Sequence, residues 1–491
     1  MAGSDSVRAR NAGDVGAWDL EADVVIVGYG GAGAAAAYEA ASAGADTLVL
    51  ERAGAGGGAS ALSGGYVYTG GGTALQKACG FTDTPDNMYD FLMAATGPNP
   101  NAEKVRVYSD EGVAYYDWLV SLGIPFKDAF YDQPTWQIAG EYGLGYSGGE
   151  NAHPWNTIAD AAPRAHVAYK PGFADSTGGE AGPGSVVMGH LMTAAEEAGA
   201  RREHDVKALR LIEEADGRVV GVQARRYGTD LTVRARKGVI LAAGGFMAND
   251  EMLTRYAPSL LGTHVVGTDG DDGRAIQMAQ AVGAGVQLMD RGECAFMIDA
   301  QLLVRCMIVN RYGQRFINED TYPGRVGQAI LTRQDREAYA IFDAETEETV
   351  NALKLMHPVQ ATWVCDSLAE LEEASGIAEG GLQSSVAYYS TYAEQGRDPM
   401  FHKNPKWLKP FHGPYGATRI GPETCASFTL GGLVTLPSGE VLDLDGGPIP
   451  GLYAAGRTAS GIPASGYLSG SSLGDAIFFG RKAGASAARN A

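Results

Sequence analysis

The chain has 491 residues, enough for two or three domains, and its 45% hydrophobic and 20% charged residues are ordinary values for a folded globular protein. Its formal net charge of −20 argues against nucleic acid as a partner, because a phosphate backbone attracts basic surfaces. No uninterrupted apolar run reaches membrane-spanning length, so we expect no transmembrane segment.

The cysteines and the N-terminus narrow the class of protein further. The five cysteines are scattered, odd in number and form no CxxC pair, which argues against a disulfide framework, a structural zinc site and an iron–sulfur cluster. We therefore expect no bound metal. Residues 1–19 are polar and mixed in charge, with no apolar signal core. These features predict a soluble, cytoplasmic protein.

The first predicted elements form a nucleotide-binding unit. The β-branched run over residues 22–27 predicts a buried parallel strand, and an Ala-rich helix follows to about residue 43, closed by Gly44. A second strand, residues 46–50, ends at Glu51, 23 positions beyond Gly28. Strand, GxGxxG, helix and acidic residue together are the dinucleotide fingerprint. It predicts cofactor contacts from Gly28, Gly30, Gly31, Ala32, Gly33 and Glu51.

The next segments suit a long, extended cofactor. Residues 52–65 are a loop of Gly, Ala and Ser, small enough for backbone to run along a ligand. Residues 205–243 predict three strands joined by turns at Asp216-Gly217 and Tyr227-Gly228, the last leading into Gly244. The predicted cofactor contacts in these two segments are Arg52, Gly57, Gly58, Ala59, Ser60, Ser63, Gly64, Gly65, Val206, Ala243 and Gly244.

The last forty residues predict a strand (residues 451–456), a Gly/Ser-rich loop and a helix that begins near Ser472. A helix start presents free N–H groups and partial positive charge, which stabilise the negative charge that a flavin ring gains on reduction. Tyr467 and Ser469 would lie beside the flavin ring at this helix start. Closure of the nucleotide domain from both chain ends favours FAD over an exchangeable nicotinamide. The expected contacts here are Gly456, Arg457, Ser472 and Leu473.

Several motifs of this chain resemble motifs of the flavoproteins related to fumarate reductase and succinate dehydrogenase. They are Gly57-Gly58-Ala59-Ser60, the segment 117–126, Asp271-Asp272-Gly273 before a helix, the segment 310–319, and Gly431-Gly432. The resemblance implies an α/β fold with a Rossmann-like FAD-binding domain, residues 18–284 and 417–491, interrupted by a smaller α+β capping domain, residues 285–416. It adds Asp272 to the expected FAD contacts.

This chain departs from the dicarboxylate-reducing members of that family. The expected cap histidine is replaced around residues 293–297, and Phe428 precedes Thr-Leu-Gly-Gly where relatives have a histidine. Residues 321–323, Thr-Tyr-Pro, stand where the proton-donor arginine is expected, and Tyr467 takes the place of a clamp arginine. A doubly charged substrate would lack its bidentate partners, so dicarboxylate reduction is disfavoured.

The C-terminal loop, residues 459–475, closely resembles that of the 3-ketosteroid Δ4-(5α)-dehydrogenases. The resemblance implies that Tyr467 donates a hydrogen bond to the C3 carbonyl oxygen and that Ser469 takes the 4β proton. Tyr322 would assist Ser469, with Tyr312 as its competitor, and flavin N5 would receive the 5α hydride. The expected function is FAD-dependent formation of a C4–C5 double bond in 3-keto-5α-steroids, with a steroid substrate and an external electron acceptor as partners.

These residue types fit the chemistry. A donor at the ketone oxygen stabilises developing enolate charge, and tyrosine donates without being ionised at neutral pH. An unaided serine hydroxyl is a poor base, so Ser469 needs to pass its own proton on to Tyr322. No His or Cys lies in the flavin-facing segments that we place, so we expect FAD to be bound non-covalently. The alternatives are a Δ1 3-ketosteroid dehydrogenase, another fumarate-reductase-like ene-reductase and a non-enzymatic flavin redox protein.

Three segments have simpler interpretations. Residues 136–155 lack periodicity and are either a steroid-lining insertion or a surface loop. Ser367 and Glu370 predict a capping box on a helix of the cap, and Asn310 to Gly313 predict a hairpin turn.

Overall fold

The computed structural model describes residues 6–173, 182–296, 298–353 and 359–490; Met297, the last residue of the segment where the cap histidine is replaced, lies outside them. The α-helices are Gly31–Ser42 (α1), Gly58–Leu62 (α2), Ala74–Ala78 (α3), Pro85–Ala95 (α4), Ala102–Asp110 (α5), Gly112–Ser121 (α6), Pro183–Glu197 (α7), Asp250–Tyr256 (α8), Arg274–Gln280 (α9), Ala300–Leu303 (α10), Pro323–Arg333 (α11), Ala344–Asn351 (α12), Leu368–Ser375 (α13), Gly381–Ala393 (α14) and Ser471–Arg489 (α15). The strands are Arg10–Asn11 (β1), Leu20–Val27 (β2), Thr47–Leu50 (β3), Tyr66–Tyr68 (β4), Phe130–Tyr131 (β5), Leu144–Gly145 (β6), Ala165–Val167 (β7), Arg201–Glu203 (β8), Val206–Glu213 (β9), Val219–Arg226 (β10), Thr229–Leu241 (β11), His264–Val265 (β12), Val286–Gln287 (β13), Gly292–Phe296 (β14), Met307–Val309 (β15), Ala338–Asp343 (β16), Trp363–Cys365 (β17), Tyr415–Ile420 (β18), Cys425–Thr429 (β19), Gly432–Leu433 (β20), Glu440–Leu442 (β21) and Pro448–Ala454 (β22).

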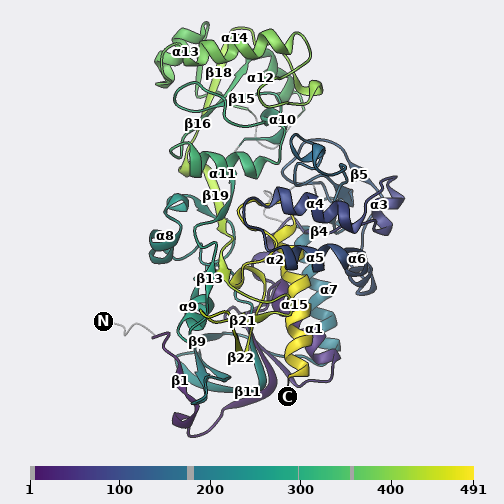
Figure 1. The fold of residues 1–491 in the computed structure, drawn as a ribbon, viewed down its shortest axis with the longest axis vertical. Helices are drawn as coiled ribbons and strands as arrows, with labels where there is room; N and C mark the ends of the chain where they lie inside the picture. Colours follow the sequence, from purple (N-terminus) through teal and green to yellow (C-terminus); the bar gives the residue numbers. More distant parts are fainter. Residues whose placement is uncertain (1–5, 174–181, 297, 354–358, 491) are drawn as a thin grey trace.

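A nine-stranded mixed sheet forms one end of the molecule (Figure 1). Its main path runs β1-β9-β10-β11-β2-β3-β8, and β22 joins it by pairing with β11. The long strand β11 is antiparallel to β10 at its start and parallel to both β2 and β22 at its end. The sheet therefore contains strands from both ends of the sequence, as predicted.

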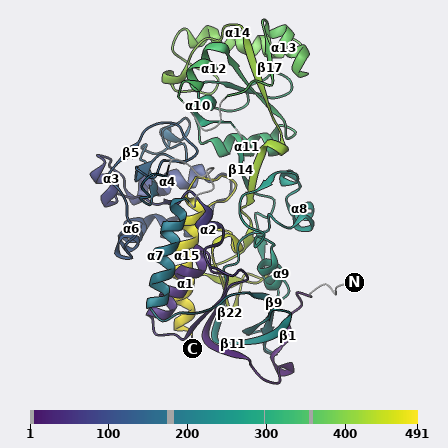
Figure 2. The same ribbon diagram turned by 180° about the vertical axis from the view of Figure 1, so that it is seen from behind.

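Small residues let the helices on this sheet approach closely. α1 and α15 lie side by side in both ribbon views, with α7 next to them (Figures 1 and 2). A Cβ at Gly480 or Gly484 of α15 would overlap a backbone carbonyl oxygen of α1. The many alanines of α1 present no bulk that would separate the two helices, and most of them are fully buried. The small residues of α1 and α15 are thus explained by the close contact of the two helices.

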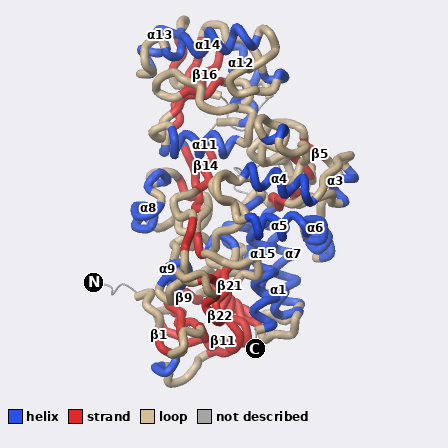
Figure 3. The backbone as a smooth tube through the Cα atoms, in the orientation of Figure 1, coloured by secondary structure: helices blue, strands red, loops and turns tan. Residues whose placement is uncertain are grey.

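The opposite end of the molecule contains a second sheet. Its order is β15-β16-β18-β17, and α12, α13 and α14 surround it (Figure 3). The antiparallel strands β14 and β19 run between this end and the large sheet, and α11 packs against β14. A further four-stranded sheet, β4-β7-β6-β5, lies beside α3 to α6.

The predicted elements of the nucleotide-binding unit are confirmed. α1 ends at Ser42, and Gly44 follows with a φ of +84°, the left-handed conformation expected beyond a helix end. The three strands of residues 205–243 are β9, β10 and β11, and the last helix begins one residue earlier than predicted. The C-terminal strand begins at Pro448 rather than Gly451 and ends at Ala454.

Two local predictions in the second sheet region are also confirmed. The capping box of Ser367 and Glu370 is present at the start of α13. Residues 310–313 form a turn, closed by a hydrogen bond from the Gly313 N–H to the Asn310 carbonyl oxygen. Among the described residues, no helix combines the length and apolar character needed to cross a membrane.

Candidate active site

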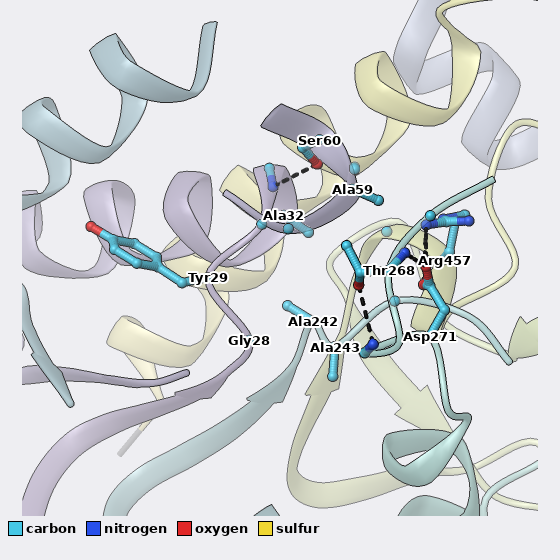
Figure 4. A pocket seen from close by; sticks show the side chains of 18 of the residues that line it. Gly28, Tyr29, Ala32, Ala59, Ser60, Ala242, Ala243, Thr268, Asp271 and Arg457 are labelled. Carbon is cyan, nitrogen blue, oxygen red and sulfur yellow. Dashed lines mark hydrogen bonds and ion pairs between the residues drawn. The ribbon is translucent and has the colours of Figure 1, made fainter. Parts of the chain in front are cut away.

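A cavity of about 560 Å³ lies where the N-termini of α1 and α15 meet the ends of β2, β11 and β22 (Figure 4). Segments from the start, middle and end of the chain line it. The predicted cofactor residues in its wall are Gly28, Gly30, Gly31, Ala32, Glu51, Arg52, Gly58, Ala59, Ser60, Ser63, Gly64, Val206, Ala243, Gly244, Asp272, Gly456, Arg457, Ser472 and Leu473. Tyr467 and Ser469 also line it.

Three predicted glycines do not line the cavity, and packing explains their presence. A Cβ at Gly33 would overlap the Gly28 carbonyl oxygen, so this glycine sets the contact between α1 and the preceding turn. A Cβ at Gly65 would overlap the backbone of Pro183 at the start of α7. Gly57 has a φ of +114° and is the N-cap of α2. These residues do not line the cavity but allow the backbone conformations and contacts next to it.

The turn between β2 and α1 is held by Glu51. One carboxylate oxygen accepts a hydrogen bond from the Tyr29 N–H at 2.8 Å, and the other accepts one from the Ala53 N–H, also at 2.8 Å. Gly28 has a φ of +101°, and a Cβ there would clash with Ala242. The Ser60 hydroxyl oxygen accepts a hydrogen bond from the first N–H of α1 at 3.0 Å (Figure 4). Backbone therefore approaches the cavity closely on this side.

Asp271 is a site residue that sequence analysis missed, although it lies in a motif that was singled out. Both of its carboxylate oxygens lie 3.0 Å from Nη2 of Arg457, and it accepts hydrogen bonds from the N–H groups of Gly245 and Thr268. Asp271 precedes α9 and Arg457 follows β22, and their side chains meet in the cavity wall (Figure 4). Asp272, the predicted residue, instead pairs with Arg52 at 3.1 Å.

These walls fit FAD. The N-terminus of α1 at Gly30 and Gly31 would offer partial positive charge to the pyrophosphate of the cofactor, and the N-terminus of α15 at Ser472 would offer the same to its reduced flavin ring. Among the described residues that line the cavity, none is a His or a Cys. Covalent attachment through those side chains thus has no candidate in the wall.

An aromatic cluster stands at the α15 end of the cavity. Tyr322, the N-cap of α11, has its ring centroid 6.1 Å from that of Tyr467, and Phe428 of β19 lies 5.1 Å from Tyr467. The three rings and Leu430 form one buried apolar cluster. Tyr322 does not line the cavity itself. Tyr312 is half exposed at the tip of its turn and belongs to another part of the molecule.

Ser469 is fixed through its backbone. Its N–H donates to the Ser147 carbonyl oxygen at 3.0 Å, and the Ser147 hydroxyl donates to the Ser469 carbonyl oxygen at 2.8 Å. Ser469 lines the cavity, and its side chain also interacts with Tyr322. Segment 136–155 therefore packs against the site at Ser147, and Gln137 lines the cavity, which favours an inner role over a plain surface loop.

Burial keeps both site tyrosines neutral. It raises the pKa of Tyr467 above its ordinary value, and the Glu293 carboxylate adds to that rise. Burial likewise raises the pKa of Tyr322, again with help from Glu293, while a hydrogen bond with Ser469 acts in the opposite direction. A phenol that stays protonated at neutral pH, such as Tyr467 in the cavity wall, can donate a hydrogen bond to an oxygen that gains negative charge.

Glu293 was noted in the sequence as part of the segment that replaces the cap histidine, without a role of its own. In the structure, its carboxylate accepts a hydrogen bond from the Tyr322 hydroxyl at 2.8 Å. No sequence signal pointed to this pair, because the two residues come from different elements, β14 and the start of α11.

The chain is similar to several known flavoproteins and enzymes. A family model described as "FAD binding domain" matches residues 23–473. A solved structure of 3-ketosteroid-delta4-(5alpha)-dehydrogenase from Rhodococcus jostii RHA1, in complex with 4-androstene-3,17-dione, is 48% identical, with a TM-score of 0.95 over 99% of this chain and 100% of that one. A fumarate reductase (cytochrome) from Shewanella frigidimarina is 29% identical over 95% of this chain and 77% of its own length. A 3-oxosteroid 1-dehydrogenase from Mycolicibacterium smegmatis is also 29% identical, over 94% and 96%.

Proposed function

Because the chain belongs to the FAD binding domain family and carries the cavity for that cofactor, we propose that it is an FAD-dependent dehydrogenase of 3-keto-5α-steroids that forms a C4–C5 double bond. The observation that carries the proposal is the juxtaposition of Tyr322, Tyr467 and Ser469 at the α15 end of the cavity. The 48% identity to a dehydrogenase of this specificity supports it.

Each of the three side chains has a role in the proposal. Tyr467 donates a hydrogen bond to the C3 carbonyl oxygen and stabilises the enolate charge that develops there. Ser469 removes the 4β proton and transfers its own hydroxyl proton toward Tyr322. FAD, when bound, supplies the two-electron acceptor for the 5α hydride. An external electron acceptor then has to reoxidise the cofactor.

The charges around Tyr467 favour a neutral ketone over a dicarboxylate. Arg457 is engaged by Asp271 and lies over the Phe428 ring, 5.1 Å from its centroid. Arg325 of α11 is stacked on Trp155, 4.4 Å from the ring centroid. Both guanidinium groups thus have partners within the protein, which argues against their use as a paired clamp for two carboxylates. Reduction of an unsaturated dicarboxylate therefore has less support than steroid dehydrogenation.

The relative with 3-oxosteroid 1-dehydrogenase activity makes C1–C2 desaturation the second candidate. Both reactions need a donor at the C3 oxygen, so Tyr467 alone does not separate them. Ser469 and Tyr322 favour attack at C4 if the steroid presents its β face to them. The regiochemistry of the product decides between the two.

We also propose the domain division 18–284 with 417–491 for FAD and 285–416 for the cap. Support comes from the separate sheet β15-β16-β18-β17 and from the β14–β19 ribbon that joins it to the rest.

Anaerobic mixing of the purified holoenzyme with 5α-androstane-3,17-dione tests the function. We expect the yellow oxidised flavin to bleach and the steroid product, identified by mass spectrometry and NMR, to carry a C4–C5 double bond. A product with a C1–C2 double bond would replace the proposal with Δ1 dehydrogenation. An enzyme that stays yellow with this steroid would contradict both.

A further inference from the structure

Glu293 contacts Tyr322, and neither residue lines the cavity. Glu293 is on β14, opposite Phe428 of β19, and only 2% of its surface is exposed. One carboxylate oxygen, Oε1, accepts the 2.8 Å hydrogen bond from the Tyr322 hydroxyl. Burial of a carboxylate is costly unless the group is paired, hydrogen-bonded or protonated, so its position next to a site tyrosine calls for an explanation.

The chain makes room for this carboxylate at Gly324. A Cβ at that position would overlap Oε1 of Glu293 and would lie 2.5 Å from the Tyr322 ring. The second carboxylate oxygen, Oε2, is buried and has no hydrogen-bond partner among the described residues. Oε1 thus accepts the hydrogen bond from the Tyr322 hydroxyl, while Oε2 is free to accept a further hydrogen bond or a proton.

The surroundings poise this group for proton exchange near neutral pH. Burial raises the pKa of Glu293 to about 7, opposed by the Tyr322 hydrogen bond, by Arg325 and by the Cys294 N–H. Four titratable groups interact with it: Tyr322 at the N-cap of α11, Arg325 of α11, Tyr467 from the loop before α15, and its chain neighbour Cys294. Burial lowers the pKa of Arg325 to about 10, so it remains a cation, and the raised pKa values keep the phenols and the thiol neutral.

We propose that Glu293 is the group to which Tyr322 passes the proton removed from the substrate. It is a positioning residue that acts through Tyr322: it orients the phenol hydroxyl toward itself and receives the hydroxyl proton. The inference rests on the proposed dehydrogenase function and extends it, because it names where the proton goes after Ser469 and Tyr322.

The transfer balances. The C4–H bond breaks, and its proton goes to the Ser469 oxygen as the Ser469 hydroxyl proton moves to the Tyr322 oxygen. The Tyr322 hydroxyl proton moves to Oε1 of Glu293, which changes from a carboxylate to a carboxylic acid. The electron pair of the C4–H bond becomes the C4–C5 double bond, and the C5 hydrogen leaves as a hydride to the cofactor. The steroid is oxidised by two electrons, and FAD is reduced.

The test is the pH dependence of anaerobic flavin reduction by saturating 5α-androstane-3,17-dione. In the wild-type holoenzyme we expect the rate to be constant above about pH 7 and to fall tenfold per pH unit below it, because the carboxylate has to be ionised to accept a proton. In Glu293→Gln, which keeps an acceptor for Tyr322 but no base, we expect a rate about 10²-fold lower and no acidic limb. FAD content should be unchanged.

Glu372→Gln is the matched control, since Glu372 of α13 is another buried glutamate but is bonded to Gly380 and Gln383 in the cap. It should keep the wild-type rate and pH profile. If Glu293→Gln loses its fold or FAD, Glu293→Asp serves instead, and its shorter carboxylate should retain an acidic limb. In a Tyr322→Phe background, adding Glu293→Gln should change the rate of flavin reduction by less than twofold, because proton transfer through Tyr322 to Glu293 is already lost.

An acidic limb that persists in Glu293→Gln would overturn the inference, as would a flat wild-type profile from pH 5.5 to 9 or a flat Glu293→Asp profile. These outcomes are distinct from failure of the proposed function. If the function is wrong, the wild-type flavin is not reduced by this steroid at all. If only the inference is wrong, the flavin is reduced, but one of these three pH profiles departs from the expected one.

Discussion

Tyr467→Phe removes one hydroxyl and little else. The ring remains packed between Tyr322 and Phe428, with centroid separations of 6.1 and 5.1 Å, and the side chain is 7% exposed. Folding and FAD content should therefore be close to wild type. If the hydroxyl stabilises enolate charge, its loss should slow flavin reduction by about 10²–10³-fold, equivalent to about 2.7–4 kcal/mol in the transition state.

The assay is anaerobic stopped-flow reduction of the flavin by 5α-androstane-3,17-dione, with the dissociation constant of the enone product measured from the flavin spectrum. Product affinity should fall much less than the rate, because the ketone oxygen carries little charge outside the transition state. A Tyr467→Phe enzyme that reduces its flavin at the wild-type rate would refute the assigned role. An equal loss in product affinity and rate would make Tyr467 a binding residue only.

Tyr322→Phe should slow flavin reduction by about 10²-fold or more, whereas Tyr312→Phe, on a half-exposed tyrosine outside the site, should react normally; similar rates for the two would remove Tyr322 from the mechanism. Gly33→Ala places a methyl group against backbone and should reduce FAD loading, while Gly189→Ala in α7, where nothing lies within 4 Å, should load fully and be slightly more stable; full loading of the Gly33 variant would contradict the packing argument. The pKa of Glu293 is 4.5 when exposed and about 7 when folded, so its contribution makes the wild type less stable as pH rises through that window. Glu293→Gln should therefore gain more in melting temperature at pH 8.5 than at pH 5, and an equal gain at both would argue against a raised pKa. Denaturation should release FAD into the supernatant, and flavin retained on the precipitated chain would indicate covalent attachment.

Local patterns were sufficient to predict the nucleotide-binding unit. The strand β2, the glycine turn, α1 and Glu51 follow one another directly, so periodicity and spacing determine them without knowledge of distant contacts. The β9–β11 meander was predicted for the same reason. The pairing of β22 with β11 joins distant parts of the chain, and it was expected only because both segments suited one long cofactor.

The remainder of the site depends on contacts that a single sequence does not display. Asp271 and Arg457 are 186 residues apart, and only folding makes them a pair. Tyr322 was placed beside Tyr467 through resemblance, not through any pattern in this chain. Glu293 was seen as the position of a missing histidine, and its contact with Tyr322 arises because Gly324 leaves space at the start of α11.

The stereochemistry of hydrogen removal tests the central claim most directly. 5α-Androstane-3,17-dione labelled with deuterium at the 4β position should give a C4–C5 unsaturated product that has lost the label, whereas the 4α-labelled steroid should retain it. Deuterium at the 5α position should slow anaerobic flavin reduction, because that hydrogen leaves as the hydride. Retention of the 4β label, or a double bond at C1–C2, would contradict the account.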